Sequence, residues 1–323
     1  MTSAARPPRI DALDVARGVA LLAMATYHFA WDLEFFGYAD PGMTARGPWK
    51  IYARGIASSF LILVGISLVL AHANGIRWPG FWKRLAMVAG AAAAISVATY
   101  VAMPSGFIFF GILHQIALGS VLGLLFLRLP WQLTLAVAAA VIAAPHFLRS
   151  PTFDQPLLWW LGLAPVNPRS NDYVPVFPWF AAILVGIAMV NLACRFGLWG
   201  RLAALRPGGW ARPFRFAGRH SLAVYLIHQP VLIACVWIFS QIWPAPIEPP
   251  QTAFARTCEA SCGETRTALF CTSYCACMLD RIETADMLDS MLSGQGGTEL
   301  NQRLTGFAEM CASETDELEV PAP

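Results

Sequence analysis

Four polar side chains interrupt the first apolar segment of the chain, DVARGVALLAMATYHFAWDL: Asp14, Arg17, His28 and Asp32. On an α-helix, Arg17 and His28 lie about 20° apart around the axis and about 16 Å apart along it, and the two aspartates each fall about 40° from His28. The segment is long enough to cross a bilayer. Charged groups at such a depth usually face a protein interior or a watered cavity. We therefore expect one helix face to line a crevice in which chemistry occurs.

The residue types on this face suit transfer of an acyl group. An imidazole such as that of His28 can accept a proton from an attacking amine or hydroxyl, or carry an acyl group transiently. Asp14 or Asp32 could orient that ring, as a third group commonly does. The guanidinium of Arg17 could hold a phosphate or a carboxylate with two hydrogen bonds. The structural alternatives are a buried histidine bonded to a neighbouring helix, and an arginine that anchors the helix by snorkelling to the membrane surface.

Two later apolar segments carry further candidate site residues. In FIFFGILHQIALGS we expect His114 and Gln115 in the middle of a helix, with at least one facing the same crevice; the alternative is a hydrogen bond between helices. In GRHSLAVYLIHQPVL, the i, i+4, i+7 spacing of Ser221, Tyr225 and His228 predicts that they share a helix face. We interpret these five residues as candidates for binding substrate.

The composition is that of a polytopic membrane protein. Hydrophobic types make up 57% of the 323 residues, charged types 13%, and the mean hydropathy is +0.53, against about half apolar and a quarter charged in soluble domains. A net charge of +2 is too small to indicate binding of nucleic acid. Seven apolar runs have spanning length. They lie near 15–36, 52–72, 85–103, 107–128, 131–148, 176–196 and 219–243.

Arginine and lysine are concentrated in the N-terminus and in the loops 73–84 and 197–218. Because cytoplasmic loops retain these residues, seven spans with the N-terminus inside place all three segments in the cytoplasm. The same count places the C-terminal tail outside, which in a bacterial inner membrane is the periplasm. The loop 149–175 would also be periplasmic, and its Trp159 and Trp160 suit either an aromatic belt at the lipid headgroups or a sugar-binding surface.

The C-terminal tail differs in composition from the rest of the chain. Six of the eight cysteines occur from Cys258 onward, after the proline cluster PAPIEPP at 244–250. We therefore predict a transmembrane domain over 1–245 and a small cysteine-rich helical domain over 246–323. Disulfides fit an oxidising compartment better than zinc does, since the tail has no histidine. One arrangement staples two antiparallel helices by Cys258–Cys275 and Cys262–Cys271 and leaves Cys277 for Cys311, out of fifteen connectivities.

The stretch LDVARGVALLAMATYHF resembles the opening helix of two related groups of membrane acyltransferases. In acyltransferase family 3, which O-acylates surface glycans, the Arg of an L-D-x-x-R-G start is followed by ten residues and then His. Arg17 and His28 fit that spacing, and Leu13, Asp14 and Gly18 fit the start. In the heparan-α-glucosaminide N-acetyltransferase catalytic-domain family the pattern is D-x-x-R-G-x-A-x-x-x-M, which Asp14, Arg17, Gly18 and Met24 match.

Two further motifs support the second family. FFGILHQIALGS resembles its F-G-[IV]-L-[QH]-x-[IL] helix, and GRHSLAVYLIHQPVL resembles the terminal G-x-x-S-L-x-x-Y-x-x-H segment that both groups share. The resemblance covers roughly residues 9–240 and fits the bacterial branch of that family. Where the animal enzymes have an Asn-Tyr-Gly-rich run, this chain has TYHFAWDLEFFG, so a catalytic role for His28 is carried over from acyltransferase family 3.

The resemblance implies an all-α inner-membrane bundle that moves an acyl group, most simply acetyl, from cytoplasmic acyl-CoA to a sugar amine or hydroxyl at the periplasmic side. It implies that Arg17 and the cytoplasmic arginines hold the phosphates of the donor and that His28 is the base. The bilayer, acyl-CoA and a glycan acceptor are then the expected partners. No metal is expected, and a homo-oligomer is compatible with the sequence.

Two functions of other classes use the same features. A proton-coupled transporter would also need intramembrane Asp, Arg and His, although the chain shows no repeated halves with matching broken helices. A membrane anchor that displays the cysteine-rich tail is the third reading. Uptake that depends on a proton gradient but not on acyl-CoA would favour the transporter.

Overall fold

The computed structural model describes residues 10–197, 200, 204–205, 207–246, 249–292 and 298–319, and within these ranges the regular structure is helical without a strand. The predicted all-α class is therefore confirmed. The chain forms two compact units: residues 1–28 with 51–231, and residues 29–50 with 232–323. The domain boundary predicted at residue 245 stays a prediction.

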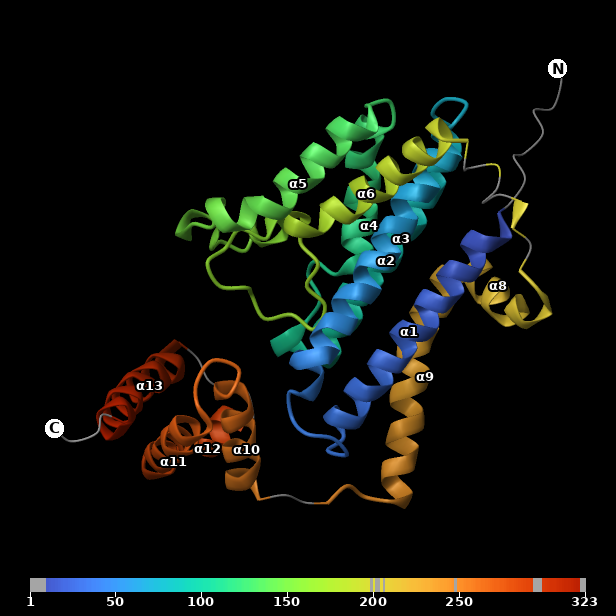
Figure 1. Cartoon of the computed structure of the whole chain (residues 1–323). Coiled ribbons are helices and arrows are strands. Elements are labelled where there is room, and N and C mark those ends of the chain that lie inside the picture. Colours follow the sequence, from blue (N-terminus) through green and yellow to red (C-terminus); the bar gives the residue numbers. More distant parts are fainter. Residues whose placement is uncertain are drawn as a thin grey trace. The chain divides into compact units, whose positions relative to one another are not determined.

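The first unit holds most of the long apolar helices, and three of them continue into the second unit (Figure 1). Its helices are α1 (Asp11–Phe35), α2 (Gly47–Ala71), α3 (Trp78–Ala102), α4 (Ile112–Gly123), α5 (Trp131–Leu148), α6 (Val176–Arg195), α8 (Arg212–Arg219) and α9 (Ser221–Ile242).

Five of these helices, α2, α3, α5, α6 and α9, are long and apolar enough to cross a membrane. Helix α1 has 25 residues, but its stripe of polar side chains sets it apart from these five. The predicted span 107–128 differs from the structure, because the chain becomes helical only at Ile112 and α4 has 12 residues. Gly111 is extended at the start of α4, so His114 lies in the first helical turn and not in the middle of a helix as expected.

Close backbone contact between α2 and α6 organises the core of the first unit. A Cβ atom on Gly65 would lie 2.1 Å from the carbonyl oxygen of Ile183, and one on Gly186 would lie 2.2 Å from that of Ile62. Small residues at a crossing let two helices approach closely. Gly65 is therefore a packing position at this crossing. Ile183 itself is fully buried in the main apolar cluster.

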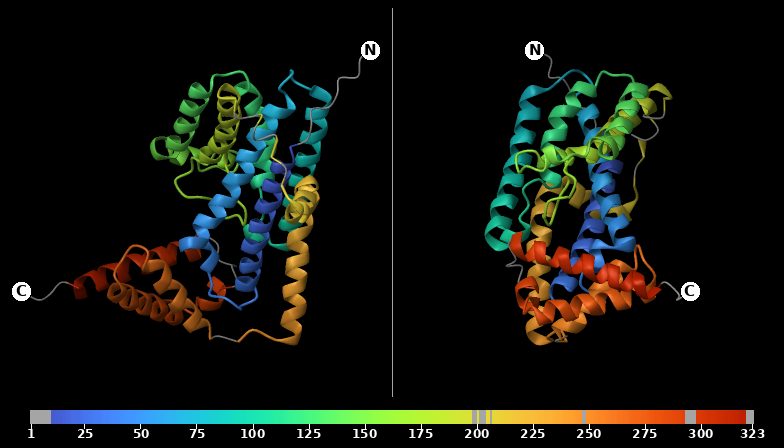
Figure 2. Two further views of the ribbon diagram at one scale, coloured as in Figure 1. Left: turned by 45° about the vertical axis from the view of Figure 1, so that its right-hand side comes forward. Right: turned by 90° about the vertical axis from the view of Figure 1, so that its left-hand side faces the viewer.

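The second unit contains four further helices, α10 (Pro250–Cys262), α11 (Ala268–Thr284), α12 (Leu288–Leu292) and α13 (Thr298–Glu319). Figure 2 shows α10 and α11 side by side. Disulfides join Cys258 to Cys275, Cys262 to Cys271 and Cys277 to Cys311. The predicted staple between two antiparallel helices is confirmed, and the third disulfide attaches α13 to α11.

Candidate functional site

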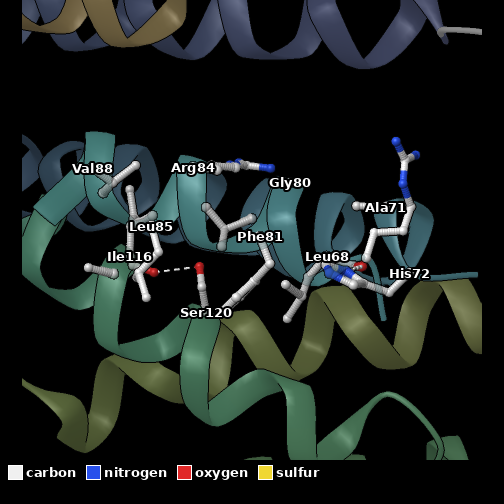
Figure 3. A pocket seen from close by; sticks show the side chains of 13 residues that line it. Leu68, Ala71, His72, Gly80, Phe81, Arg84, Leu85, Val88, Ile116 and Ser120 are labelled. Carbon is white, nitrogen blue, oxygen red and sulfur yellow. Dashed lines mark hydrogen bonds between the residues drawn. The ribbon is translucent and has the colours of Figure 1, made fainter. Parts of the chain in front are cut away.

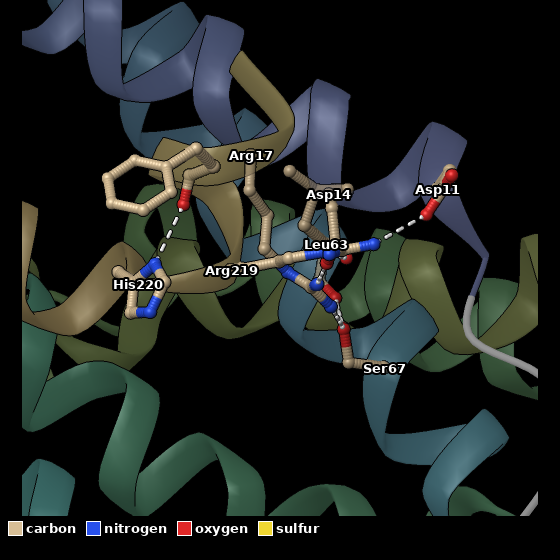
Figure 4. A network of polar contacts seen from close by, with 8 residues as sticks. Asp11, Asp14, Arg17, Leu63, Ser67, Arg219 and His220 are labelled. Carbon is tan, nitrogen blue, oxygen red and sulfur yellow. Dashed lines mark hydrogen bonds and ion pairs between the residues drawn. The ribbon is translucent and has the colours of Figure 1, made fainter. Parts of the chain in front are cut away.

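The beginning of α1 carries a charged network (Figure 4). Arg17 donates to Oδ1 of Asp14 at 2.7 Å and, through its second terminal nitrogen, to Oγ of Ser67 on α2 at 2.6 Å. Asp14 is buried, so the ion pair compensates the cost of removing its carboxylate from water. Arg17 is thus held in one position by neighbours on two helices.

The same end of α1 is tied to α8 by charge and by close packing. Asp11 accepts from Arg215 at 2.8 Å and from Arg219 at 3.0 Å. Gly18 approaches the backbone of Phe214, and Gly218 approaches that of Asp14, so closely that a Cβ on either glycine would lie within 2.0 Å of a carbonyl oxygen. Arg215, from the predicted cytoplasmic loop 197–218, and the adjoining Arg219 therefore position α1. Arg201 and Arg206 of that loop lie outside the described residues.

Further along α1, His28 faces His228 of α9. The ring centroids are 5.0 Å apart, with the planes inclined by 63°. Nδ1 of His228 lies 2.6 Å from the carbonyl oxygen of Tyr225, and because a carbonyl only accepts, Nδ1 carries the proton. Nε2 of His228 is buried and has no hydrogen-bond partner among the described residues. In the neutral ring that nitrogen keeps a lone pair, which is the form that a base requires.

His114 has both ring nitrogens in use. Nδ1 accepts from the backbone N–H of Gly111 at 3.2 Å, and Nε2 lies 3.2 Å from Oγ of Ser96 on α3. A neutral ring that accepts at Nδ1 donates at Nε2, and Ser96 in turn donates to the carbonyl oxygen of Ile108. This arrangement fixes α3 against the start of α4, which is the structural alternative for this histidine.

Asp172 caps α4 from the loop that precedes α6. Its Oδ2 accepts from the backbone N–H of Ile112 at 2.8 Å, which satisfies one free donor at the helix N-terminus and places a carboxylate at the positive end of the helix dipole. Burial raises the pKa of Asp172 to about 6, against the effect of the Ile112 hydrogen bond. Asp172, His114 and Tyr225 line one small cavity that has no room for a water molecule.

The structure therefore places the predicted site residues in separate groups. Asp14 pairs with Arg17, His28 contacts His228, and His114 shares a cavity with Tyr225. Asp32 is fully buried but belongs to the second unit, so its predicted role toward His28 stays a prediction. Gln115 is buried and Ser221 begins α9, and their binding roles stay predictions too.

The crevice expected beside His28 also stays a prediction. His28 lines neither the small cavity at Asp172 nor a larger one between α2 and α3. In the described part of the chain, no three His, Cys, Asp or Glu side chains are grouped to hold a metal ion.

Three residues of these groups were not singled out from the sequence for the contacts they make: Ser67, Ser96 and Asp172. Each contacts a segment distant in sequence, at 50, 18 and 60 residues respectively. Ser67 and Ser96 are isolated hydroxyls in apolar segments, and that is the one signal that could have marked them. The partner of each hydroxyl depends on tertiary structure.

The fold and these groups define a polytopic α-helical membrane protein with ionised and imidazole side chains inside its helical bundle. The chain belongs to the family described as heparan-alpha-glucosaminide N-acetyltransferase, catalytic, which matches residues 9–230. Membership identifies a membrane acetyltransferase and confirms the resemblance seen in the sequence. The match ends before α10, and no curated protein or solved structure matches the chain.

Proposed function

We propose that this protein transfers an acyl group, most simply acetyl, from cytoplasmic acyl-CoA to an amine or hydroxyl of a sugar at the periplasmic side of a bacterial inner membrane. One observation carries the proposal: two imidazoles from opposite ends of the family-matched region, His28 and His228, lie with ring centroids 5.0 Å apart inside the first unit. Neither ring is fully exposed. A pair of titratable rings in that position can take up and return a proton away from bulk solvent.

The simplest chemistry is direct transfer. The acceptor nitrogen or oxygen attacks the thioester carbonyl while His28, assisted by His228, removes its proton. Collapse of the tetrahedral intermediate breaks the C–S bond, and the proton passes from imidazolium to the departing thiolate, which gives free CoA and the acylated sugar. Proton transfer by a positioned histidine contributes typically about 10²–10⁴-fold to such a rate.

Arg17 supports this proposal as a donor-binding residue. Two of its N–H groups are directed at Asp14 and Ser67, and a guanidinium has five. The remaining donors make no hydrogen bond to a side chain in the described part of the chain, and we propose that they meet a phosphate or the thioester oxygen. Because Asp14 compensates the charge, Arg17 can remain in an apolar bundle before the donor binds.

The orientation in the membrane follows from the distribution of charge and cysteine. Arg77, Lys83 and Arg84 accompany the turn between α2 and α3, and Arg212, Arg215 and Arg219 occur in α8. With these segments in the cytoplasm, the three disulfides of the tail form in the periplasm. We propose that the tail there covers the acceptor side or binds a partner.

Labelled acetyl-CoA supplied to inside-out vesicles with amino-sugar and glycan acceptors tests the function. The wild type should transfer label to an acceptor, and His28→Ala should reduce transfer by about 10²-fold or more. His146→Ala is the matched control, because His146 is an exposed histidine near the end of α5. Equal transfer by the wild type and His28→Ala would refute the catalytic role of His28. Uptake of a solute that is driven by a proton gradient and does not need acyl-CoA would refute the proposed enzymatic function.

A further inference from the structure

A cavity of about 210 Å³ lies between α2, α3 and α4, beside the turn that joins α2 to α3. Figure 3 shows Arg84 and His72 among the side chains around it, together with Phe81, Leu68 and Ile116. The site described above does not include this cavity. Its lining combines basic and apolar side chains, and each kind indicates what would fill it.

The charged or titratable side chains that line the cavity are all basic. Arg77 and Arg84 line it, and so does His72. The ring of His72 donates from Nδ1 to the carbonyl oxygen of Leu68 at 2.8 Å, while its Nε2 is buried and makes no hydrogen bond to a described residue. Protonation of Nε2 supplies a further donor. All three basic side chains line the same cavity.

Acidic side chains that would neutralise these arginines are absent over a long stretch of sequence. No aspartate or glutamate occurs between Asp40 and Asp154, a range that includes all of α2 to α5. Among the described residues, neither Arg77 nor Arg84 forms an ion pair. By contrast, Arg17, Arg215 and Arg219 are all paired with aspartates. The cationic charge at the cavity therefore lacks a partner within this part of the protein.

The first turn of α3 begins at the same place. Pro79 has no N–H and the N–H of Phe81 bonds to the carbonyl oxygen of Arg77, which leaves the N–H groups of Trp78 and Gly80 as the donors of this turn. Gly80 lines the cavity, and a Cβ built on it meets nothing within 4 Å. Arg77 is the residue before α3, and its side chain makes no capping hydrogen bond. Free N–H groups and the positive end of the dipole at a helix N-terminus favour phosphate.

Most of the remaining lining is apolar. Val64, Leu68, Leu85, Val88 and Ile116 belong to it, and Ser120 satisfies its own hydroxyl by donating to the carbonyl oxygen of Ile116. A simple inorganic anion would leave these apolar side chains without a partner. A molecule with a phosphate at one end and a flexible, less polar arm at the other matches both kinds of side chain.

From these observations we propose that the cavity at the α2–α3 turn binds the phosphate-bearing end of an amphipathic ligand through Arg77, Arg84, His72 and the N-terminus of α3. Two sources share this chemistry: coenzyme A with its pantetheine arm, and an anionic phospholipid with its acyl chain. Identification of the ligand as the acyl donor rests on the proposed function, whereas the phosphate site itself does not.

The preference for Arg and Lys in cytoplasmic loops would by itself explain basic residues at this turn. Lys83 distinguishes this explanation from phosphate binding. It lies next to Arg84 on α3, carries the same charge and is exposed like Arg84, but it does not line the cavity. If the charges serve topology alone, Lys83 and Arg84 are equivalent. If the cavity binds phosphate, only Arg77 and Arg84 matter.

Equilibrium binding of labelled CoA to the full chain in nanodiscs of zwitterionic lipid tests the proposal. Arg84→Gln and Arg77→Gln should each weaken binding by about tenfold or more, since each removes a charge-assisted hydrogen-bond donor. Lys83→Gln should change it by less than about twofold. Arg84→Lys should restore part of the affinity, which distinguishes a binding role from a structural one, and thermal unfolding of each variant checks that it is folded.

Nanodiscs with added phosphatidylglycerol distinguish the two sources. The phosphate site is supported if this lipid displaces CoA from the wild type. It is also supported if the lipid binds in place of CoA and its binding depends on Arg84. Wild-type binding of neither ligand overturns the proposal, and so does CoA affinity that is unchanged in Arg77→Gln and Arg84→Gln. Normal CoA binding without acetyl transfer would instead refute the proposed function and leave the cavity assignment intact.

Discussion

His28 and His228 are separated by 200 residues of sequence, yet their rings lie 5.0 Å apart between α1 and α9. Tyr225 contributes to the same contact, because its carbonyl oxygen accepts from Nδ1 of His228 and its ring lies 5.7 Å from that imidazole. This bond fixes the tautomer of His228. The two histidines are therefore positioned to share one proton, and their effects on catalysis should not be independent.

We expect His28→Ala and His228→Ala each to reduce acetyl transfer by about 10²-fold or more, and the double variant to be little worse than the more damaging single one. Residues that act as a unit in catalysis are strongly non-additive when replaced together. The measurement is the initial rate of acetyl transfer from acetyl-CoA in membrane vesicles, with protein amounts matched.

If the rate of the double variant falls by the product of the two single fold-losses, the two rings act separately. His220→Ala is the control, because His220 lies eight residues before His228 in the same sequence motif but is exposed. Its Nδ1 lies 3.1 Å from the carbonyl oxygen of Phe216. This variant should retain wild-type activity.

The sequence predicts local features of this protein well. The expected span 131–148 coincides with α5, where Pro130 directly precedes the helix. The polar stripe of α1 follows from helical periodicity alone, and the i, i+4 spacing of cysteines in two short helices limits how they can pair. In each case the physical cause lies within a few residues of chain.

What the sequence misses depends on contacts between distant segments. Hydropathy does not distinguish the non-helical residues 107–110 from the helix that follows, because both are apolar. Asp172 lies 60 residues from the N–H group that it caps, and Ser67 lies 50 residues from Arg17. No periodicity links such residues, so their pairing emerges only from the packed bundle.

The crossing of α2 and α6 predicts a strong response to one methyl group. Gly65→Ala or Gly186→Ala places a Cβ near 2 Å from a carbonyl oxygen, so the helices must separate. Such overpacking typically costs about 1–3 kcal/mol. Thermal unfolding in detergent should show a midpoint several degrees lower for either variant.

Gly90→Ala is the control for this prediction, because a Cβ on Gly90 in α3 meets nothing within 4 Å. Alanine favours a helix over glycine by about 1 kcal/mol, so this variant should be as stable as the wild type or more stable. Equal stability of Gly65→Ala and Gly90→Ala would contradict the close crossing.

Asp172 predicts a dependence of stability on pH. Its pKa in the folded protein is about 6, against an ordinary value of 3.8, so between these values the folded state binds the proton more tightly than the unfolded state. The contribution of Asp172 to the free energy of unfolding should therefore be largest at about pH 4 and below, and it should fall as the pH rises toward 6. Above pH 6 this contribution should change little. The full loss is at most about 3 kcal/mol, since a tenfold change in an equilibrium constant is worth about 1.4 kcal/mol.

Asp172→Asn should remove this component, because the amide oxygen can still accept from the N–H of Ile112 but does not ionise. Unfolding midpoints of the wild type and Asp172→Asn, measured in detergent from pH 4.5 to 7.5, give the comparison. Parallel profiles for the two proteins would contradict the assignment. Asp154→Asn is a suitable control, since Asp154 lies in the same loop and accepts from Trp159.

The two free cysteines predict a specific pattern of thiol labelling. Cys194 and Cys235 are exposed and unpaired, while the six cysteines of the tail form three disulfides. Maleimide added to denatured, non-reduced protein should modify two thiols per chain, and reduction before labelling should raise the number to all eight cysteines. Intact mass measures both values.

The Cys277–Cys311 bond closes the longest of the three loops, with a sequence separation of 34, and it alone attaches α13 covalently to α11. Loop-closure entropy then makes it worth about 2–4 kcal/mol. Cys277→Ser with Cys311→Ser should therefore release α13 to limited proteolysis, while Cys194→Ser should not. Protection of α13 in the double variant would show that its apolar contacts to Met278 and Ile282 suffice to hold the helix in place.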